Sequence, residues 1–484
     1  MIRAQLLAVT LIALPVSAVP VAAQRIAPLP RPAAPVGTGP LTLDEVLQAS
    51  ARAAPQIVEA LAKVRAAQGR ALTADGAFDT VFEAEGRSRA LGYYDGTVAS
   101  AGVTRPLGDN GGYTYGGYRV SRGTFPVYED QNYTNRLGEM KVGALYSLLR
   151  DRLIDERRTR RTLASVDIDV AQFEREAVAI GVQRRAVDAY QNWVAAGLRL
   201  RAYRDLLALS ESRRGGLARQ VQLGARADIL LTENDQNLVR RRALVVRAEG
   251  DFQAAANALS LYFRDAAGEP IVVAPERLPD GAQALAGIDA VARADVEQRR
   301  PDLQVLLARI DQASARIALA RNELRPRLDL RGEVGKDVGP VGLGGSTRTP
   351  LEAAVGFRFS MPLQNRTAKG KLAEASAEMD ALTARSRFLR DQIAVEVEGI
   401  AINVGAAERL VTIAEQERQL AERLAAAERR RFALGSSDFF LVNQREETAN
   451  DARVRLIDAQ VRIAAARAEL AAATADRRAL GLEP

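Results

Sequence analysis

The chain repeats itself once, and this duplication constrains its fold more than any other feature. Residues 55–64 realign on residues 301–310 at an offset of 246, and residues 142–147 realign on residues 355–360 at an offset of 213. A third correspondence sets Leu223-Gly224 on Leu434-Gly435. Each repeat is about 200 residues long, far beyond the units of ordinary solenoids. We therefore expect two copies of one large module.

The N-terminus has the pattern of an export signal. Arg3 precedes an apolar run over residues 6–19, and small residues at 21–23 suit a cleavage site. The run is too short to favour the alternative, a spanning membrane anchor. We therefore predict a signal peptide over residues 1–23. Residues 24–40 contain five prolines and no apolar periodicity, which predicts an extended linker.

Composition excludes several classes of function. The chain has no Cys and no His, so it lacks disulfides, the cysteine of a bacterial lipid anchor and the usual members of a hydrolase triad. No Gly-rich phosphate loop follows a strand. We therefore expect no enzyme activity, no metal site and no cofactor. The net charge of +7 is spread over helices with interleaved acids, and export argues against nucleic-acid partners.

Two tracts without proline, residues 127–269 and 363–483, are rich in strong helix formers. Apolar residues recur there every three or four positions, as at Leu410, Ile413 and Leu420, which favours coiled-coil packing over an ordinary bundle. The two longest predicted helices would each measure roughly 100 Å at 1.5 Å per residue. We expect long helices over 149–223 and 365–434, return helices over 228–264 and 439–479, and opening helices over 43–75 and 290–324.

Between the helices, over about 78–147 and 325–361, the apolar period changes from 3.6 to 2. One strand face carries seven charged residues, which in a barrel would line the lumen: Glu83, Glu85, Arg87, Asp329, Arg331, Glu333 and Arg358. A soluble sheet with one wet face and a membrane β-barrel both show this alternation. Eight of the eleven tyrosines lie in the first strand region, which favours an interfacial girdle.

The number of strands limits how a barrel could form. Apart from the signal, no run of 18 or more apolar residues exists, so membrane entry would require a closed β-barrel. Each repeat offers two clear strands, so we expect four per chain. Because a closed barrel needs about eight strands, several chains would have to contribute. Segment 97–121, rich in Gly and Tyr, suggests a further hairpin that this count does not place.

Several segments in this order resemble TolC-like outer membrane efflux proteins. Those of the second repeat are residues 299–303, 325–330, 359–366 and 431–444, and residues 221–234 match the helix-tip turn of the first repeat. The resemblance covers about residues 41–480. It divides the chain into a first repeat, 41–270, and a second repeat, 271–484, each with an opening helix, strands, a long helix, a tip turn near residue 224 or 435, and a return helix.

The resemblance implies an α+β membrane protein. Three identical chains would supply four strands each to a 12-stranded outer membrane barrel in contact with lipid, continuous with a periplasmic α-helical coiled-coil barrel. It also implies a passive outer membrane exit duct of a tripartite efflux or type I secretion system in a Gram-negative bacterium. Its partners would be a periplasmic adaptor and an inner-membrane pump of the resistance-nodulation-division or ABC type.

The resemblance directs attention to the helix tips. Gly224 and Gly435 suit turns that need φ > 0, and with Leu223 and Leu434 they correspond to the family's adaptor-docking surface. Just beyond the turns, the family narrows its tunnel with acidic residues.

At the matching positions this chain has Glu233 in the first repeat and Asn443 and Phe440 in the second, whereas Asp228 and Asp438 suit helix caps. We predict that Glu233 lines the constriction, where a ring of three carboxylates would attract cations. The alternative is an ordinary exposed helix carboxylate.

Two other classes of protein compete with this interpretation. A periplasmic adaptor is also exported and combines a coiled coil with β-structure, but usually has one helical hairpin flanked by β-domains. Here two helical tracts are each preceded by strands. A soluble coiled-coil scaffold explains neither the alternating strands nor the tyrosines.

Overall fold

The computed structural model describes residues 39–89, 91–281, 283, 285, 293–344 and 348–482. The chain divides into two units, Met1–Pro35 and Val36–Pro484, and only the second contains described residues. The predicted signal peptide and most of the predicted linker therefore lie outside the described residues.

The helices confirm the duplication. The first repeat contains α1 (Leu43–Ala53), α2 (Pro55–Asp75), α3 (Glu156–Gln222) and α4 (Ile229–Leu259), and the second contains α5 (Arg293–Arg299), α6 (Pro301–Glu323), α7 (Arg366–Ala433) and α8 (Phe439–Ala473). Short 3₁₀ helices lie between these elements at Gly76–Phe78 (η1), Val127–Asn132 (η2) and Pro275–Arg277 (η3). The long helices α3 and α7 have 67 and 68 residues.

Each opening helix, predicted as continuous, is broken at an equivalent proline. Pro55 begins α2 and Pro301 begins α6, and the residues before them, Ala54 and Arg300, have extended backbones with ψ of 124° and 113°. Proline disfavours the helical conformation in the residue that precedes it, which explains both breaks. The continuous predictions over 43–75 and 290–324 are therefore corrected to pairs of helices.

The long helices pack as coiled coils. Helix α7 packs against α6 and then α8, so two shorter helices in series accompany one long helix, and α3 packs against α2 and α4 as well as against α6 and α8 of the second repeat. The buried residues of α7 recur mostly at intervals of seven, as at Ile393, Ile400, Ala407, Ala414 and Ala421. That heptad spacing is typical of a coiled-coil seam.

A single antiparallel sheet contains, in chain order, all six strands of the described residues. They are β1 (Val81–Ser88), β2 (Thr97–Pro106), β3 (Tyr113–Arg122), β4 (Glu139–Ser147), β5 (Arg327–Asp337) and β6 (Glu352–Ser360). The expected count of four strands per chain is therefore wrong. Segment 97–121 forms the hairpin β2–β3, which lies within the sheet because β2 pairs with β1 along its other edge and β3 pairs with β4.

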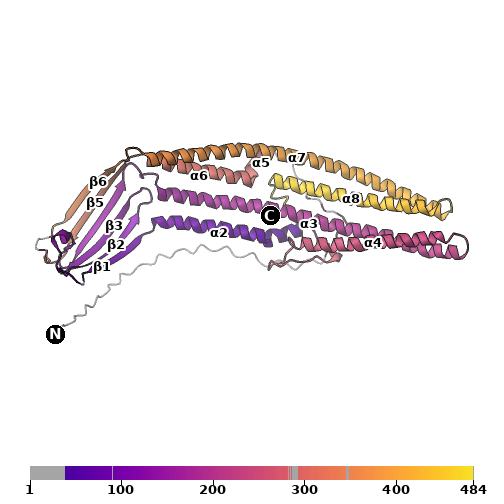
Figure 1. The fold of residues 1–484 in the computed structure, drawn as a ribbon, viewed down its shortest axis with the longest axis horizontal. Helices are drawn as coiled ribbons and strands as arrows, with labels where there is room; N and C mark the ends of the chain where they lie inside the picture. The colour runs from indigo at the N-terminus through magenta and orange to yellow at the C-terminus, as the bar shows by residue number, and fades with distance from the viewer. Residues whose placement is uncertain are drawn as a thin grey trace, which may run out of the picture. The chain divides into compact units, whose positions relative to one another are not determined.

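Within the unit Val36–Pro484, Figure 1 shows the sheet at one end of the helices and the α3–α4 and α7–α8 turns at the other. The largest hydrophobic core lies between these ends, where Trp193 stacks on Phe252 with ring centroids 5.9 Å apart and Tyr190 donates a hydrogen bond to the Leu41 carbonyl at 2.8 Å. None of the described helices combines the length and the apolar character that a membrane span requires.

Candidate functional site

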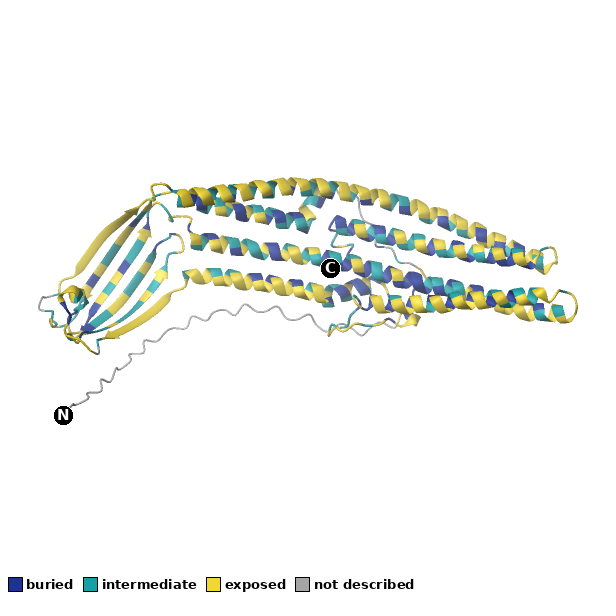
Figure 2. Ribbon diagram, viewed as in Figure 1, coloured by how far each residue is buried: buried dark blue, intermediate teal, exposed yellow. Residues whose placement is uncertain are grey.

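The sheet has two chemically different faces. Residues directly opposite each other in paired strands share a face, and following the register across all six strands places the seven charged residues predicted from the alternation on one face. The opposite face carries Phe82, Val142 and Phe357 and is exposed in the single chain; Val355 and Phe357 are 80% and 79% exposed. Figure 2 shows exposed residues along both outer strands. The prediction that these residues share a face is confirmed.

On the charged face, Glu333 of β5 is the centre of a network that spans three strands. Its carboxylate accepts a hydrogen bond from the Tyr115 hydroxyl at 2.7 Å and forms ion pairs with Arg331 at 2.8 Å and with Lys141 at 3.4 Å. Tyr115 reaches Glu333 from β3 by crossing Gly143 of β4, where a Cβ atom would collide with the tyrosine ring. The glycine therefore allows β3 to be tied to β5 across the strand between them.

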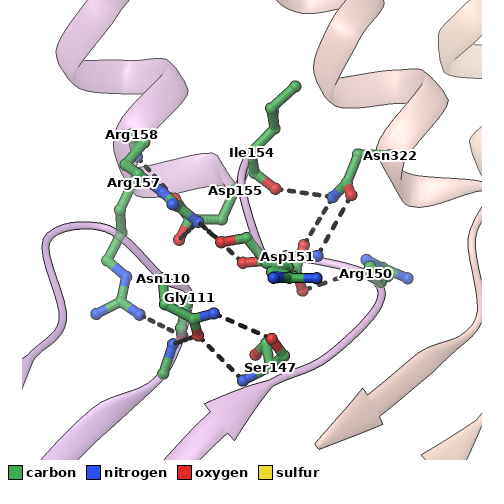
Figure 3. A network of polar contacts seen from close by, with 12 residues as sticks. Asn110, Gly111, Ser147, Arg150, Asp151, Ile154, Asp155, Arg157, Arg158 and Asn322 are labelled. Atoms are coloured by element: carbon green, nitrogen blue, oxygen red, sulfur yellow. Dashed lines mark hydrogen bonds and ion pairs between the residues drawn. The ribbon is translucent and has the colours of Figure 1, made fainter.

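The turn between β2 and β3 is fixed where the sheet meets the helices (Figure 3). The buried Asn110 accepts hydrogen bonds from the backbone N–H groups of Gly112 and Ser147, both at 3.0 Å, and its own amide donates to the Ser147 carbonyl at 3.0 Å. Arg157, in the first turn of α3, donates to the Gly111 carbonyl at 3.1 Å. The hairpin is thus anchored to the end of β4 and the start of α3.

The same junction joins the two repeats. Asn322, in the last turn of α6, donates to Asp151 Oδ1 at 3.0 Å and to the Ile154 carbonyl at 2.9 Å (Figure 3). Asp151 has a φ of +66°, a conformation that Asp tolerates better than most residues, and its carbonyl accepts a hydrogen bond from Arg158 at 2.9 Å. These contacts fix the direction in which α3 leaves the sheet.

At the other end of the helices, the two tip turns have the same geometry. After α3, the Gly224 N–H donates to the Val221 carbonyl and the N–H of the next residue donates to the Gln220 carbonyl, both at 2.9 Å; α7 ends with the same pair of bonds around Gly435. This is a Schellman motif, in which the glycine adopts positive φ. The φ values, +68° at Gly224 and +74° at Gly435, confirm the predicted role of both glycines.

The tips present bare apolar side chains. Leu223 is 76% exposed, Leu434 is 83% exposed and Phe440 is 71% exposed. The predicted caps differ: Asp438 accepts a hydrogen bond from the Leu441 N–H at 2.7 Å, whereas Asp228 makes no capping bond and that prediction is wrong. Asp228 has helical backbone angles, a conformation unlike the extended one typical of a capping residue.

Close to the tips, a buried polar cluster joins the repeats, and sequence reasoning missed it. Glu446 of α8 accepts a hydrogen bond from Arg213 of α3 and lies 3.5 Å from Arg241 of α4. Arg241, only 1% exposed, also donates to the Leu206 carbonyl at 3.1 Å and to Ser210. Burial lowers the pKa of the Arg241 guanidinium, and the Glu446 carboxylate opposes that shift.

The three candidate constriction residues occupy different environments. Glu233 is half-buried and, among the described residues, has no hydrogen-bond or ion-pair partner. Phe440 is exposed, whereas Asn443 is buried and accepts a hydrogen bond from Arg213 at 3.0 Å. In the single chain, therefore, Asn443 contributes to packing between α3 and α8.

Part of the chain matches a known protein family. Residues 293–476 match the family of outer membrane efflux proteins. A search of curated proteins gave no match.

Solved structures match most of the chain. The open state of the MtrE outer membrane channel of Neisseria gonorrhoeae is 17% identical, with a TM-score of 0.63, over 89% of this chain and 88% of that one. VceC of Vibrio cholerae is 16% identical, with a TM-score of 0.61, over 91% and 96%. CmeC of Campylobacter jejuni is 14% identical, with a TM-score of 0.59, over 89% and 85%.

These findings confirm the resemblance drawn from the sequence. Residues 293–476 of the second repeat match that family, and the chain has the fold of these outer membrane channels over about nine-tenths of its length.

Proposed function

We propose that this chain forms, as a homotrimer, the passive exit duct through which an inner-membrane pump expels its cargo across periplasm and outer membrane. One observation carries the proposal: a sheet with one charged and one exposed apolar face continues directly into helices of 67 and 68 residues. At 1.5 Å per residue, each such helix extends about 100 Å. A duct that does no chemistry leaves energy supply and cargo choice to the pump.

Exposed apolar surface on α7 supports assembly from several chains. Besides the buried heptad seam, α7 carries a second stripe that includes Val395, Ile402, Ile413 and Leu420, each more than half exposed in the single chain. Monomeric proteins rarely leave so long an apolar stripe uncovered. An isolated chain leaves this stripe exposed to water, whereas neighbouring chains in a helical tube would cover it.

The two faces of the sheet support a membrane wall. In a transmembrane barrel the apolar face contacts lipid and the charged face lines the water-filled interior. We infer that the network around Glu333, together with Glu83, Glu85, Arg87, Asp329, Arg331 and Arg358, faces the lumen. The exposed tyrosines Tyr118 and Tyr146 belong to the apolar face, where an aromatic side chain suits the lipid interface.

The helix tips are the surface we assign to a periplasmic adaptor. Leu223 and Leu434 project from turns whose glycines have open space around the position of a Cβ atom, so a partner could approach the backbone closely. Replacing both leucines by Asp should abolish adaptor capture by the detergent-solubilised trimer and leave the oligomer mass unchanged. Undiminished capture would remove the tips from the interface.

We propose that Glu233 lines the constriction. A ring of three carboxylates, one from each protomer, would attract cations. Glu233→Gln should reduce the cation selectivity of channels in a planar bilayer, with Glu249→Gln, further along α4, as the control. Unchanged selectivity would leave Glu233 as an ordinary solvated carboxylate.

The duct itself is tested by extraction and mass measurement. Membranes are separated, the outer membrane fraction is extracted with detergent, and light scattering determines the mass of the protein component. The proposal predicts three processed chains in the outer membrane fraction. A soluble protein, or a particle with another number of chains, would contradict it.

A further inference from the structure

The two edges of the sheet show how one chain joins the next. Strands β1 and β6 are exposed along their whole length in the single chain. Neither contains a proline or a lysine, the residues that commonly protect an edge from pairing. Because the sheet has an even number of antiparallel strands, β6 runs opposite to β1. A second copy could therefore continue the sheet with the same antiparallel alternation.

Two charged residues on the edges lack the kind of ion pair seen inside the sheet. On the inner strands, Arg119 pairs with Glu139 at 2.6 Å, and Arg327 pairs with Asp329 at 2.7 Å. On the edges, Glu83 of β1 and Arg358 of β6 lie on the same charged face, yet neither has a hydrogen-bond or ion-pair partner within the part of the chain that the structure describes. The acid is on one edge and the base is on the other.

The register determines where these two residues would meet. Val81 begins β1 just after η1, and Ser360 ends β6 just before α7. Both residues therefore lie at the strand ends that are nearest the helices. Aligning these two ends places Val81 opposite Ser360. The same alignment places Glu83 opposite Arg358, on the charged face of both strands.

The strand tilt required by this alignment is physically reasonable. Within one chain, the pairing from β1 to β6 leads from Val81 to Ala354, six residues before Ser360. An offset of six residues over six strands is one residue per strand. With a rise of about 3.4 Å per residue and a strand spacing of about 4.8 Å, the tilt is about 35°, within the usual range for barrels.

We propose that β6 of one protomer pairs with β1 of the next, with Glu83 opposite Arg358, so that six strands from each chain form the membrane wall. This rests on the trimeric duct proposed above. A trimer then builds an 18-stranded barrel in place of the 12-stranded barrel that the resemblance implied. The hairpin β2–β3 is part of the wall, held by Tyr115 on the charged face and by Asn110 at the junction with the helices.

The additional strands widen the barrel. At the same spacing and tilt, 18 strands give a backbone diameter of about 34 Å, against about 23 Å for 12 strands. Each chain contributes four helices to a cross-section, and twelve helices spaced about 9 Å apart form a ring about 35 Å across. The wall of the barrel would therefore continue the helical tube without a step in diameter.

Cysteine cross-linking tests the closure, because the natural chain contains no Cys. The double variant Glu83→Cys/Arg358→Cys is oxidised in membranes, and each single variant serves as the control. Directly opposed strand residues lie close enough for a disulfide. We expect covalent dimers and trimers on a denaturing gel that return to monomers on reduction. The single variants should remain monomeric.

A second pair tests whether the hairpin belongs to the wall. Glu85 and Ser100 are directly opposed between β1 and β2, so Glu85→Cys/Ser100→Cys should form a disulfide within one chain of the trimer. If light scattering confirms a trimer and either pair fails to cross-link, the six-strand closure is wrong although the duct survives. If no trimer forms, it is the proposed function that fails.

Discussion

The two repeats share their helices but differ in their strands. The long helices α3 and α7 differ by one residue in length, and each ends in a Schellman turn around a glycine at positive φ. Within the residues that the structure describes, the first repeat nevertheless has four strands where the second has two. An antiparallel hairpin can be added within a sheet because it leaves the direction of every following strand unchanged. A helix inserted in a coiled coil would instead displace the whole seam.

The repeats also differ just beyond their tips. Asp235 and Glu446 each lie eleven residues after the tip glycine. Asp235 is partly exposed and binds Arg214 of its own repeat at 2.6 Å; that hydrogen bond holds the pKa of Asp235 below its usual value. Glu446 is buried and binds two arginines of the other repeat. One acid therefore stabilises a hairpin, and the other joins two hairpins.

The largest effect should come from Glu446→Ala. It would leave Arg213 and Arg241 without their shared carboxylate, and removing one partner of a buried ion pair typically costs about 3–5 kcal/mol. Thermal unfolding of the detergent-solubilised protein should move to lower temperature, and amide hydrogen exchange should increase where α8 packs against α3.

Asp235→Ala provides the matched control for that prediction. Its partner Arg214 remains in contact with water, so the change in unfolding temperature should be much smaller. Equal decreases in unfolding temperature in the two variants would mean that burial does not distinguish the two acids, and that Glu446 does not join the repeats.

An intermediate effect is expected at the tip glycines. Alanine at a left-handed position costs roughly 1–2 kcal/mol, and no atom lies within 4 Å of a Cβ atom built at either glycine. Gly224→Ala and Gly435→Ala should therefore destabilise their hairpins equally, measured by hydrogen exchange in the last turns of α3 and α7. Increased hydrogen exchange at only one tip would show that the two turns are not equivalent in stability.

The smallest effect concerns the caps, where the repeats should differ. Asp438→Ala removes the bond to the Leu441 N–H, and loss of an N-cap costs about 1 kcal/mol. Asp228→Ala removes no such bond. Hydrogen exchange should increase in the first turn of α8 and stay unchanged in the first turn of α4. The opposite pattern would contradict the assigned caps.

Much of this fold could be predicted from local sequence. Proline-free tracts and apolar stripes located the long helices within several residues, and Leu-Gly pairs located both tips. The hairpin β2–β3 was not placed because Gly102, Gly116 and Gly117 interrupt the alternation that identifies a half-buried strand. Its position depends on pairing with β1 and β4, and strand pairing leaves no comparable mark on a single segment.

The candidate sites were predictable to different degrees. Positive φ at Gly224 and Gly435 is a local property of a helix end, so the sequence was sufficient. The cluster around Glu446 was missed because Arg213 and Arg241 are more than 200 residues away along the chain. Two arginines and a glutamate on helices rich in both residue types carry no signal until the helices are packed.

Electron cryomicroscopy of the detergent-extracted protein tests the central claim most directly, because a cross-section through the membrane wall counts its strands. The account predicts three chains around one axis and 18 strands, with β6 of each chain beside β1 of the next. A 12-stranded wall with β2–β3 outside it, or a particle that is not a trimer, would contradict the account.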